Sequence, residues 1–222
     1  MSYQVTHLHS KESFTRPRIL VNQNQQSREW HQEIDPAIET FHQQLPSYGE
    51  TKLHELPSVA AELGFSNVFV KDESSRFGLP SFKILGASWA IHRGLCQHLG
   101  LPASTTLAEL TDALKGRDDV SLVLTTEGNW GRAVARMGKY LGIPVLVYVP
   151  YFMNAYTQDL ICSEGAEVKL MEGKSYDDCV DIVKEAAGKA GQVAVMDLSW
   201  EGFTEIPQVR LPNYYSCEFM LI

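Results

Sequence analysis

The sequence predicts an α/β fold in which a parallel sheet is covered by helices. From residue 67 onward, short apolar runs alternate with segments whose apolar residues recur at helical spacing. Such alternation is typical of parallel strands that are joined by crossover helices. Glycine follows five of the expected helices, where the left-handed backbone of a helix end favours it: Gly100, Gly116, Gly142, Gly165 and Gly191. The boundaries of the elements are therefore well marked.

The individual elements follow from these signals in chain order. Asp35 and Pro36 predict the start of a short amphipathic helix within residues 34–45. Strands are expected at residues 68–70, 121–124, 145–149, 167–171 and 192–196. Helices are expected at residues 83–99, 107–114, 130–141, 154–163 and 176–190. Residues 1–47 otherwise form a polar extension that is rich in Gln, His and Ser.

The composition narrows the class of function. The chain has 222 residues, of which 44% are hydrophobic and 21% are charged, as in an ordinary soluble protein. Its net charge of −8 argues against a nucleic-acid or membrane-surface partner, because phosphate binding needs a basic surface. The N-terminus shows no signal segment, and no stretch is apolar enough to span a membrane, so we expect a cytoplasmic protein with a small-molecule partner. No metal site is expected, because the histidines and the four cysteines lack ligand spacing: Cys96, Cys162, Cys179 and Cys217.

Two short motifs carry the chemistry. Lys83 follows Ser-Phe and opens a predicted helix, whose positive end disfavours the protonated amine and leaves it able to attack an aldehyde. Residues 125–131 read Thr-Thr-Glu-Gly-Asn-Trp-Gly, and the glycines on either side of Asn129 would let a flat ring approach the backbone. This loop lies at the carboxyl end of a strand, the usual ligand edge of such sheets. The motifs indicate Schiff-base chemistry on an amino acid; a solvated Lys83 and a helix-capping Asn129 are the alternatives.

Residues 48–207 resemble the diaminopropionate ammonia-lyases, a branch of the fold-type-II pyridoxal-phosphate enzymes in the tryptophan synthase β-like superfamily. The resemblance rests on residues 70–87, where Arg-Phe-Gly-Leu precedes Phe-Lys, and on residues 197–203. It implies the three-layer parallel sheet of that superfamily with an incomplete second domain. It also implies pyridoxal 5′-phosphate as cofactor and α,β-elimination on 2,3-diaminopropionate or a similar amino acid, giving pyruvate and ammonia. A homodimer is a possible assembly.

The resemblance also implies residue roles. Lys83 would form the imine with the cofactor, and Asn129 would bond the 3-hydroxyl of its ring. Glu127 would be the acid or base on the face opposite Lys83, and Asp197 would lie near the substrate amine. The alternatives are a solvated turn for Glu127 and a strand-end turn for Asp197. The family motif has Asp at the position of Glu127 and His at that of Trp130. The remaining expected cofactor contacts are Phe82, Gly128 and Gly131.

By the same resemblance, the chain divides into four parts: an extension (1–47), the first part of a large cofactor domain (48–83), a small α/β domain (84–197) and a truncated return to the large domain (198–222). No glycine-rich turn for the cofactor phosphate is found, and no glycine follows Gly202. Two functions therefore stay open: an active lyase, and a catalytically inactive truncated remnant that is either misfolded or a binding or oligomerisation partner of a full-length paralogue. A nucleotide-binding domain is disfavoured because no Gly-x-Gly-x-x-Gly follows a strand. We expect poor packing after about Pro207.

Overall fold

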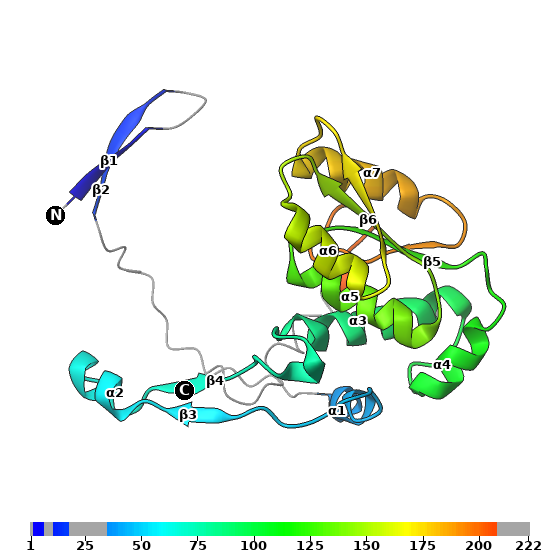
Figure 1. The fold of residues 1–222 in the computed structure, drawn as a ribbon, viewed down its shortest axis with the longest axis horizontal. Helices are drawn as coiled ribbons and strands as arrows, with labels where there is room; N and C mark the ends of the chain where they lie inside the picture. Colours follow the sequence, from blue (N-terminus) through cyan, green and yellow to red (C-terminus); the bar gives the residue numbers. More distant parts are fainter. Residues whose placement is uncertain (1, 7–10, 18–34, 208–222) are drawn as a thin grey trace. The chain divides into compact units, whose positions relative to one another are not determined.

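A computed structural model describes residues 2–6, 11–17 and 35–207. The chain divides into two units, residues 1–33 and 34–222, which are described separately. The first unit contains an antiparallel pair of strands, β1 (Ser2–Thr6) and β2 (Ser13–Pro17), drawn in blue in Figure 1. The sequence predicted only a polar extension there. The packing expected after Pro207 concerns residues outside the described ranges.

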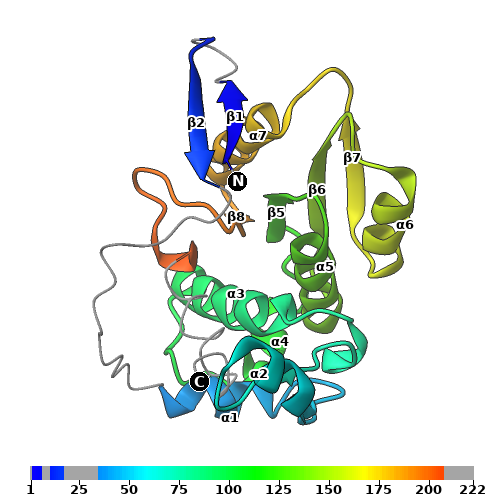
Figure 2. The same cartoon turned by 90° about the vertical axis from the view of Figure 1, so that its left-hand side faces the viewer.

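A four-stranded parallel sheet forms the centre of the second unit. Its strands are β5 (Ser121–Thr125), β6 (Val145–Pro150), β7 (Glu167–Met171) and β8 (Gln192–Ala194), in the order β7-β6-β5-β8. All three pairings are parallel, and Figure 2 shows β6 and β7 side by side. The predicted α/β class with a parallel sheet is confirmed.

Helices cover both faces of this sheet. The long helix α3 (Lys83–Leu99) packs on α5 (Asn129–Leu141), and α5 also contacts α4 (Leu107–Leu114) and α6 (Ala155–Ser163). The helix α7 (Tyr176–Ala187) packs on β5, β6 and β8. Because parallel crossovers are right-handed, reversal of the strand order at β7 places α7 on the face opposite α5 and α6. The predicted three layers follow from this reversal, and Figure 1 shows them.

The predicted boundaries agree closely with the observed ones. Both ends of α3, α4 and β7 are as predicted. Capping boxes at Thr106 and Ser175 explain where α4 and α7 begin. The prediction that the last helix reaches residue 190 was wrong, because α7 ends at Ala187 and Gly188 occupies its C-cap. The strand expected to reach residue 196 ends at Ala194.

The strand expected at residues 68–70 is β4 (Phe69–Lys71), but it lies outside the parallel sheet. It pairs antiparallel with β3 (Leu53–Glu55), and α2 (Pro57–Leu63) connects the two strands; neither β3 nor α2 was expected from the sequence. A single 3₁₀ turn, η1 (Arg76–Gly78), follows β4. The predicted helix near residue 35 is α1 (Pro36–His42), which Asp35 caps by accepting a hydrogen bond from the Ala37 N–H. Within the described residues, no helix is long and apolar enough to cross a membrane.

The core joins α1, α3, α5 and the sheet. Ile38 and Phe41 of α1 are buried together with Ile84 and Ile91 of α3. Residues of the expected N-terminal extension are thus part of the main core. Ile206, near the end of the described residues, is buried in the same core. The further division of this unit at residues 48, 84 and 198 stays a prediction.

A buried ion-pair network holds the turn before α3. Arg132 and Arg136 of α5 contact the Glu164 carboxylate at 3.2 and 2.5 Å, and Glu164 is 5% exposed. Arg136 also donates a hydrogen bond to the Phe77 carbonyl of η1 at 3.1 Å. Since a buried charge is costly unless it is paired, this network fixes η1 against α5. The start of α3 is thereby placed relative to the sheet.

His42 makes folding stability depend on pH. Its ring is buried and donates a hydrogen bond from Nε2 to the Leu85 carbonyl at 3.0 Å. Burial lowers the pKa of His42 to about 4, although the hydrogen bond to Leu85 and the charge of Glu39 act in the opposite direction. The folded chain therefore keeps this imidazole neutral where an unfolded chain would protonate it.

We expect the free energy of unfolding to fall as the pH drops from about 6.5 to 4, because only the unfolded state then takes up a proton at His42. The loss should reach about 3 kcal/mol at the acid end. Urea titrations at several pH values measure it. His42→Gln should flatten the profile, whereas His54→Gln, which removes only an exposed ion pair with Asp72, should leave the fall between about pH 6.5 and 4 in place. Equal profiles for the unmodified chain and His42→Gln would contradict this assignment.

Candidate active site

The Thr126 hydroxyl fixes the loop that follows β5. Its Oγ1 accepts hydrogen bonds from the backbone N–H groups of Gly128 and Gly131, both at 3.1 Å. Gly128 occupies the N-cap position of α5, and Asn129 is the first helical residue. The alternative in which the Asn129 side chain caps this helix is therefore wrong. Asn129 and Glu127 are exposed at the carboxyl edge of the sheet.

The two glycines of this loop differ in whether the structure would accept a side chain at their positions. A Cβ on Gly131 would lie 2.3 Å from Cγ2 of Thr126 and 3.1 Å from Cδ1 of Ile161, so close packing requires glycine there. A Cβ on Gly128 would meet nothing within 4 Å. Gly128 therefore faces open space in which a flat group could lie against the backbone.

Lys83 begins α3 and lies close to a carboxylate and two aromatic rings. Its Nζ is 3.7 Å from Oδ2 of Asp197, 5.8 Å from the ring centre of Phe82 and 6.0 Å from that of Trp130. The lysine side chain is 29% exposed. These contacts disfavour the alternative of a solvated first-turn lysine, and they bring Lys83 close to Trp130 of the loop after β5.

The segment that carries Asp197 is bonded to the neighbouring elements. The Val195 N–H donates to the Val123 carbonyl of β5 at 2.9 Å, which extends the sheet pairing beyond β8. The Val195 carbonyl accepts a hydrogen bond from the indole Nε1 of Trp130 at 3.0 Å. The sulfur of Met196 accepts from the Thr125 N–H at 3.3 Å. These contacts hold Asp197 at the edge where the loop after β5 also lies.

Tyr176, which opens a helix that the sequence predicted, belongs to this edge as well. It is half-buried at the start of α7, directly after the loop that follows β7. Burial, followed by the negative charges of Asp197 and Glu127, raises the pKa of Tyr176 to about 12. The phenol thus stays neutral and can donate a hydrogen bond. Its position after a parallel strand is the sequence signal that could have found it.

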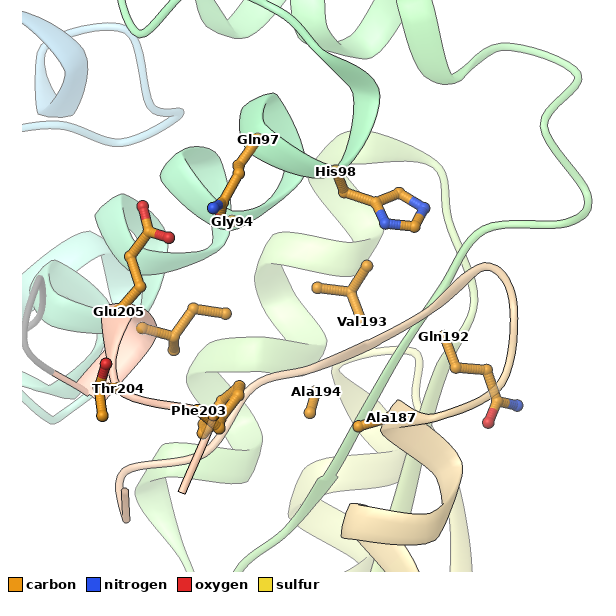
Figure 3. A pocket seen from close by; sticks show the side chains of 12 residues that line it. Gly94, Gln97, His98, Ala187, Gln192, Val193, Ala194, Phe203, Thr204 and Glu205 are labelled. Carbon is orange, nitrogen blue, oxygen red and sulfur yellow. The ribbon is translucent and has the colours of Figure 1, made fainter. Parts of the chain in front are cut away.

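A cavity of about 350 Å³ lies elsewhere in the unit (Figure 3). The ends of α3 and α7 line it with β8 and residues 202–206. Gly94, its first lining residue on α3, follows Lys83 by eleven positions, which is roughly 16 Å along a helix axis. The proposed site residues do not line this cavity, so we do not assign the chemistry to it. Among the described parts of the chain, no group of His, Cys, Asp and Glu is arranged to hold a metal ion.

Comparison with known proteins defines the class. A family model described as pyridoxal-phosphate dependent enzyme matches residues 45–218. The chain is 34% identical over 187 residues to a diaminopropionate ammonia-lyase of Salmonella typhimurium and 36% identical over 174 residues to one of Escherichia coli. These matches cover 82% and 78% of this chain but only 45% and 43% of the relatives. This chain therefore belongs to the pyridoxal-phosphate-dependent enzyme family and spans less than half the length of these curated relatives.

Solved structures agree with this assignment. The crystal structure of holo diaminopropionate ammonia lyase from Escherichia coli aligns with a TM-score of 0.74 at 34% identity, over 82% of this chain and 46% of that one. A threonine deaminase from Solanum lycopersicum, at 18% identity and a TM-score of 0.57, shares the fold. The resemblance to the ammonia-lyases and the predicted fold class are confirmed.

The two loop glycines give a matched test. We expect Gly131→Ala to destabilise the fold by about 1–3 kcal/mol, because its Cβ would collide with Thr126 in a packed region. Gly128→Ala should leave stability unchanged, since open space receives the methyl group. Urea denaturation of both variants measures the difference. Equal stabilities would show that the turn adapts to a side chain at either position.

Proposed function

We propose that this chain binds pyridoxal 5′-phosphate through Lys83. We further propose that it eliminates ammonia from 2,3-diaminopropionate or a similar small amino acid, with pyruvate and ammonia as products. The observation that carries the proposal is the approach of the Lys83 amine to the Asp197 carboxylate at 3.7 Å, beside the loop after β5. A small amino-acid partner and a cytoplasmic location belong to the same proposal.

The described residues fit the cofactor. Lys83 supplies the amine that would hold its aldehyde carbon, and Asn129 is exposed for the ring hydroxyl. The open space at Gly128 would accept the flat ring, and Phe82 is exposed beside the amine. When bound, the cofactor supplies an electron sink for the charge that develops at the substrate α-carbon.

The side chains of this chain would handle the protons. Lys83 would take the α-proton from one face of the substrate and return it to the leaving amino group. Glu127 would act on the opposite face, which an enzyme for both enantiomers needs, because one base reaches only one face of the α-carbon. Asp197 attracts cationic amines, including that of Lys83. The neutral phenol of Tyr176 is available as a donor to these carboxylates.

A second candidate function is association with a full-length relative without catalysis. The exposed apolar side chains near α2 and β4 favour it: Leu63 is 59% exposed, Phe65 is 62% and Val70 is 45%. Apolar surface of this kind is typical of an interface.

The first test asks where the cofactor attaches. Incubation with pyridoxal 5′-phosphate followed by borohydride should leave a stable adduct on Lys83, which peptide mass spectrometry locates. Lys83→Ala should abolish it, and Lys115→Ala, which removes a surface lysine paired with Asp112, should not. Labelling of a different lysine would remove the assignment.

The second test separates the two carboxylates. Glu127→Gln should keep the Lys83 adduct but slow turnover of one enantiomer of 2,3-diaminopropionate by at least about a hundredfold. Asp197→Asn should slow turnover of both enantiomers, because its carboxylate lies beside the shared amine. A coupled assay for pyruvate measures both. An adduct without any turnover in the unmodified chain would favour the binding role, and equal losses for both enantiomers in Glu127→Gln would remove its facial role.

A further inference from the structure

Trp130 links two parts of the candidate site. The side chain is 4% exposed at the start of α5. Its indole Nε1 donates a hydrogen bond to the Val195 carbonyl, two residues before Asp197, and its ring centre lies 6.0 Å from Nζ of Lys83. One buried side chain therefore contacts both the segment with the carboxylate and the amine that this carboxylate approaches.

We propose that Trp130 is a positioning residue that holds the Asp197 carboxylate beside the Lys83 amine. That Trp130 holds the carboxylate beside the amine is inferred from the structure alone. Only the importance of Trp130 for catalysis rests on the proposed function. Trp130 need not touch substrate or cofactor for this role.

The position of Asp197 needs such a support because it lies beyond the sheet. The strand β8 ends at Ala194, and beyond it the segment bonds to β5 through the Val195 N–H, which donates to the Val123 carbonyl, and through the Met196 sulfur, which accepts from the Thr125 N–H. The indole N–H binds the carbonyl of the same Val195, so both of its backbone polar groups are paired. Breaking this bond would leave a buried carbonyl unsatisfied, which favours movement of the segment.

The aromatic face of Trp130 contributes a second effect. A ring face attracts an ammonium group within about 6 Å of its centre, and Nζ of Lys83 lies at this limit. The hydrogen bond therefore restrains the carboxylate, and the ring favours the lysine conformation that faces it. The two effects thus act on the two partners of one ion pair.

Two substitutions separate the hydrogen bond from simple bulk. Trp130→Phe keeps an apolar six-membered ring but removes the N–H donor. Trp130→His is smaller, yet its Nε2 can occupy the position in the five-membered ring that Nε1 has in tryptophan. It is also the residue type that the ammonia-lyase motif has here. If bulk were decisive, the phenylalanine variant would be the better substitute, whereas a positioning hydrogen bond favours the histidine variant.

Zero-length coupling with a water-soluble carbodiimide measures the separation directly, without cofactor or activity. The reagent activates the Asp197 carboxylate, the Lys83 amine attacks it to form an amide, and the reagent leaves as its urea. Mass spectrometry of the linked peptides gives the yield. The Lys184 to Asp181 pair, at 2.8 Å on α7, serves as the reference within each sample. Trp89→Phe is the matched control, because this buried tryptophan of α3 stacks on His92.

We expect Trp130→Phe to lower the Lys83 to Asp197 coupling about fivefold relative to the reference pair, as the loss of a typical hydrogen bond predicts. Trp130→His should stay within about twofold of the unmodified chain, and Trp89→Phe should not change the ratio. Undiminished coupling in Trp130→Phe, equal losses in both Trp130 variants, or an equal loss in Trp89→Phe would overturn the proposal.

Should both Trp130 variants fail to fold, a variant that keeps Trp130 still provides a measurement. Lys83→Met removes the charge that faces the ring, so it should shift the indole N–H resonance of Trp130 and leave that of Trp89 in place. An unshifted Trp130 resonance would overturn the proposal. Normal coupling in a chain without a cofactor adduct on Lys83 would instead reject the proposed function and keep the positioning role.

Discussion

The hydroxyl of Thr126 is the interaction on which the candidate site depends. By accepting two backbone N–H groups, it turns the chain sharply from β5 into α5. Gly131 allows the helix to press against this threonine, because no Cβ intervenes. The turn leaves Gly128 facing open space and carries Trp130 inward, toward Lys83 and the segment of Asp197. A single side-chain oxygen thus sets the direction of both the exposed and the buried parts of the loop.

Parallel topology explains why residues far apart in the sequence meet at this edge. The loop after β5 and the segments after β7 and β8 all emerge at the carboxyl ends of the strands. Lys83 is different, since it comes from a helix that precedes the sheet. Its place depends on η1, which Arg136 holds through the Phe77 carbonyl while Glu164 neutralises the arginine. Buried ion pairs contribute little net stability when their desolvation is counted. We therefore assign to this pair the placement of η1 rather than a gain in stability.

Local patterns predicted what local interactions determine. The bounds of α3 and α4 follow from apolar spacing and capping residues. The strand β4 was expected within one residue of its observed bounds, but its antiparallel partner β3 was missed, because a three-residue strand carries little periodic signal. The helix α2 was missed although Pro57 begins it, because it spans only seven residues and Leu56 offers no side-chain cap. The contact between Lys83 and Trp130 depends on tertiary proximity, which no local pattern encodes. The place of Tyr176 after a parallel strand is, by contrast, a signal that the sequence carries.

The charges at the edge bear on the substrate that would fit there. The negative charges of Asp197 and Glu127 both raise the pKa of Tyr176, and the Lys83 amine lies beside the Asp197 carboxylate. The phenol stays neutral over the physiological pH range, so it adds a hydrogen-bond donor without adding charge. A diamino acid carries one more ammonium group than serine or threonine, and each ammonium group gains from a nearby carboxylate in a partly desolvated site. The acidic surroundings of Lys83 therefore support our proposal of a substrate with two amino groups.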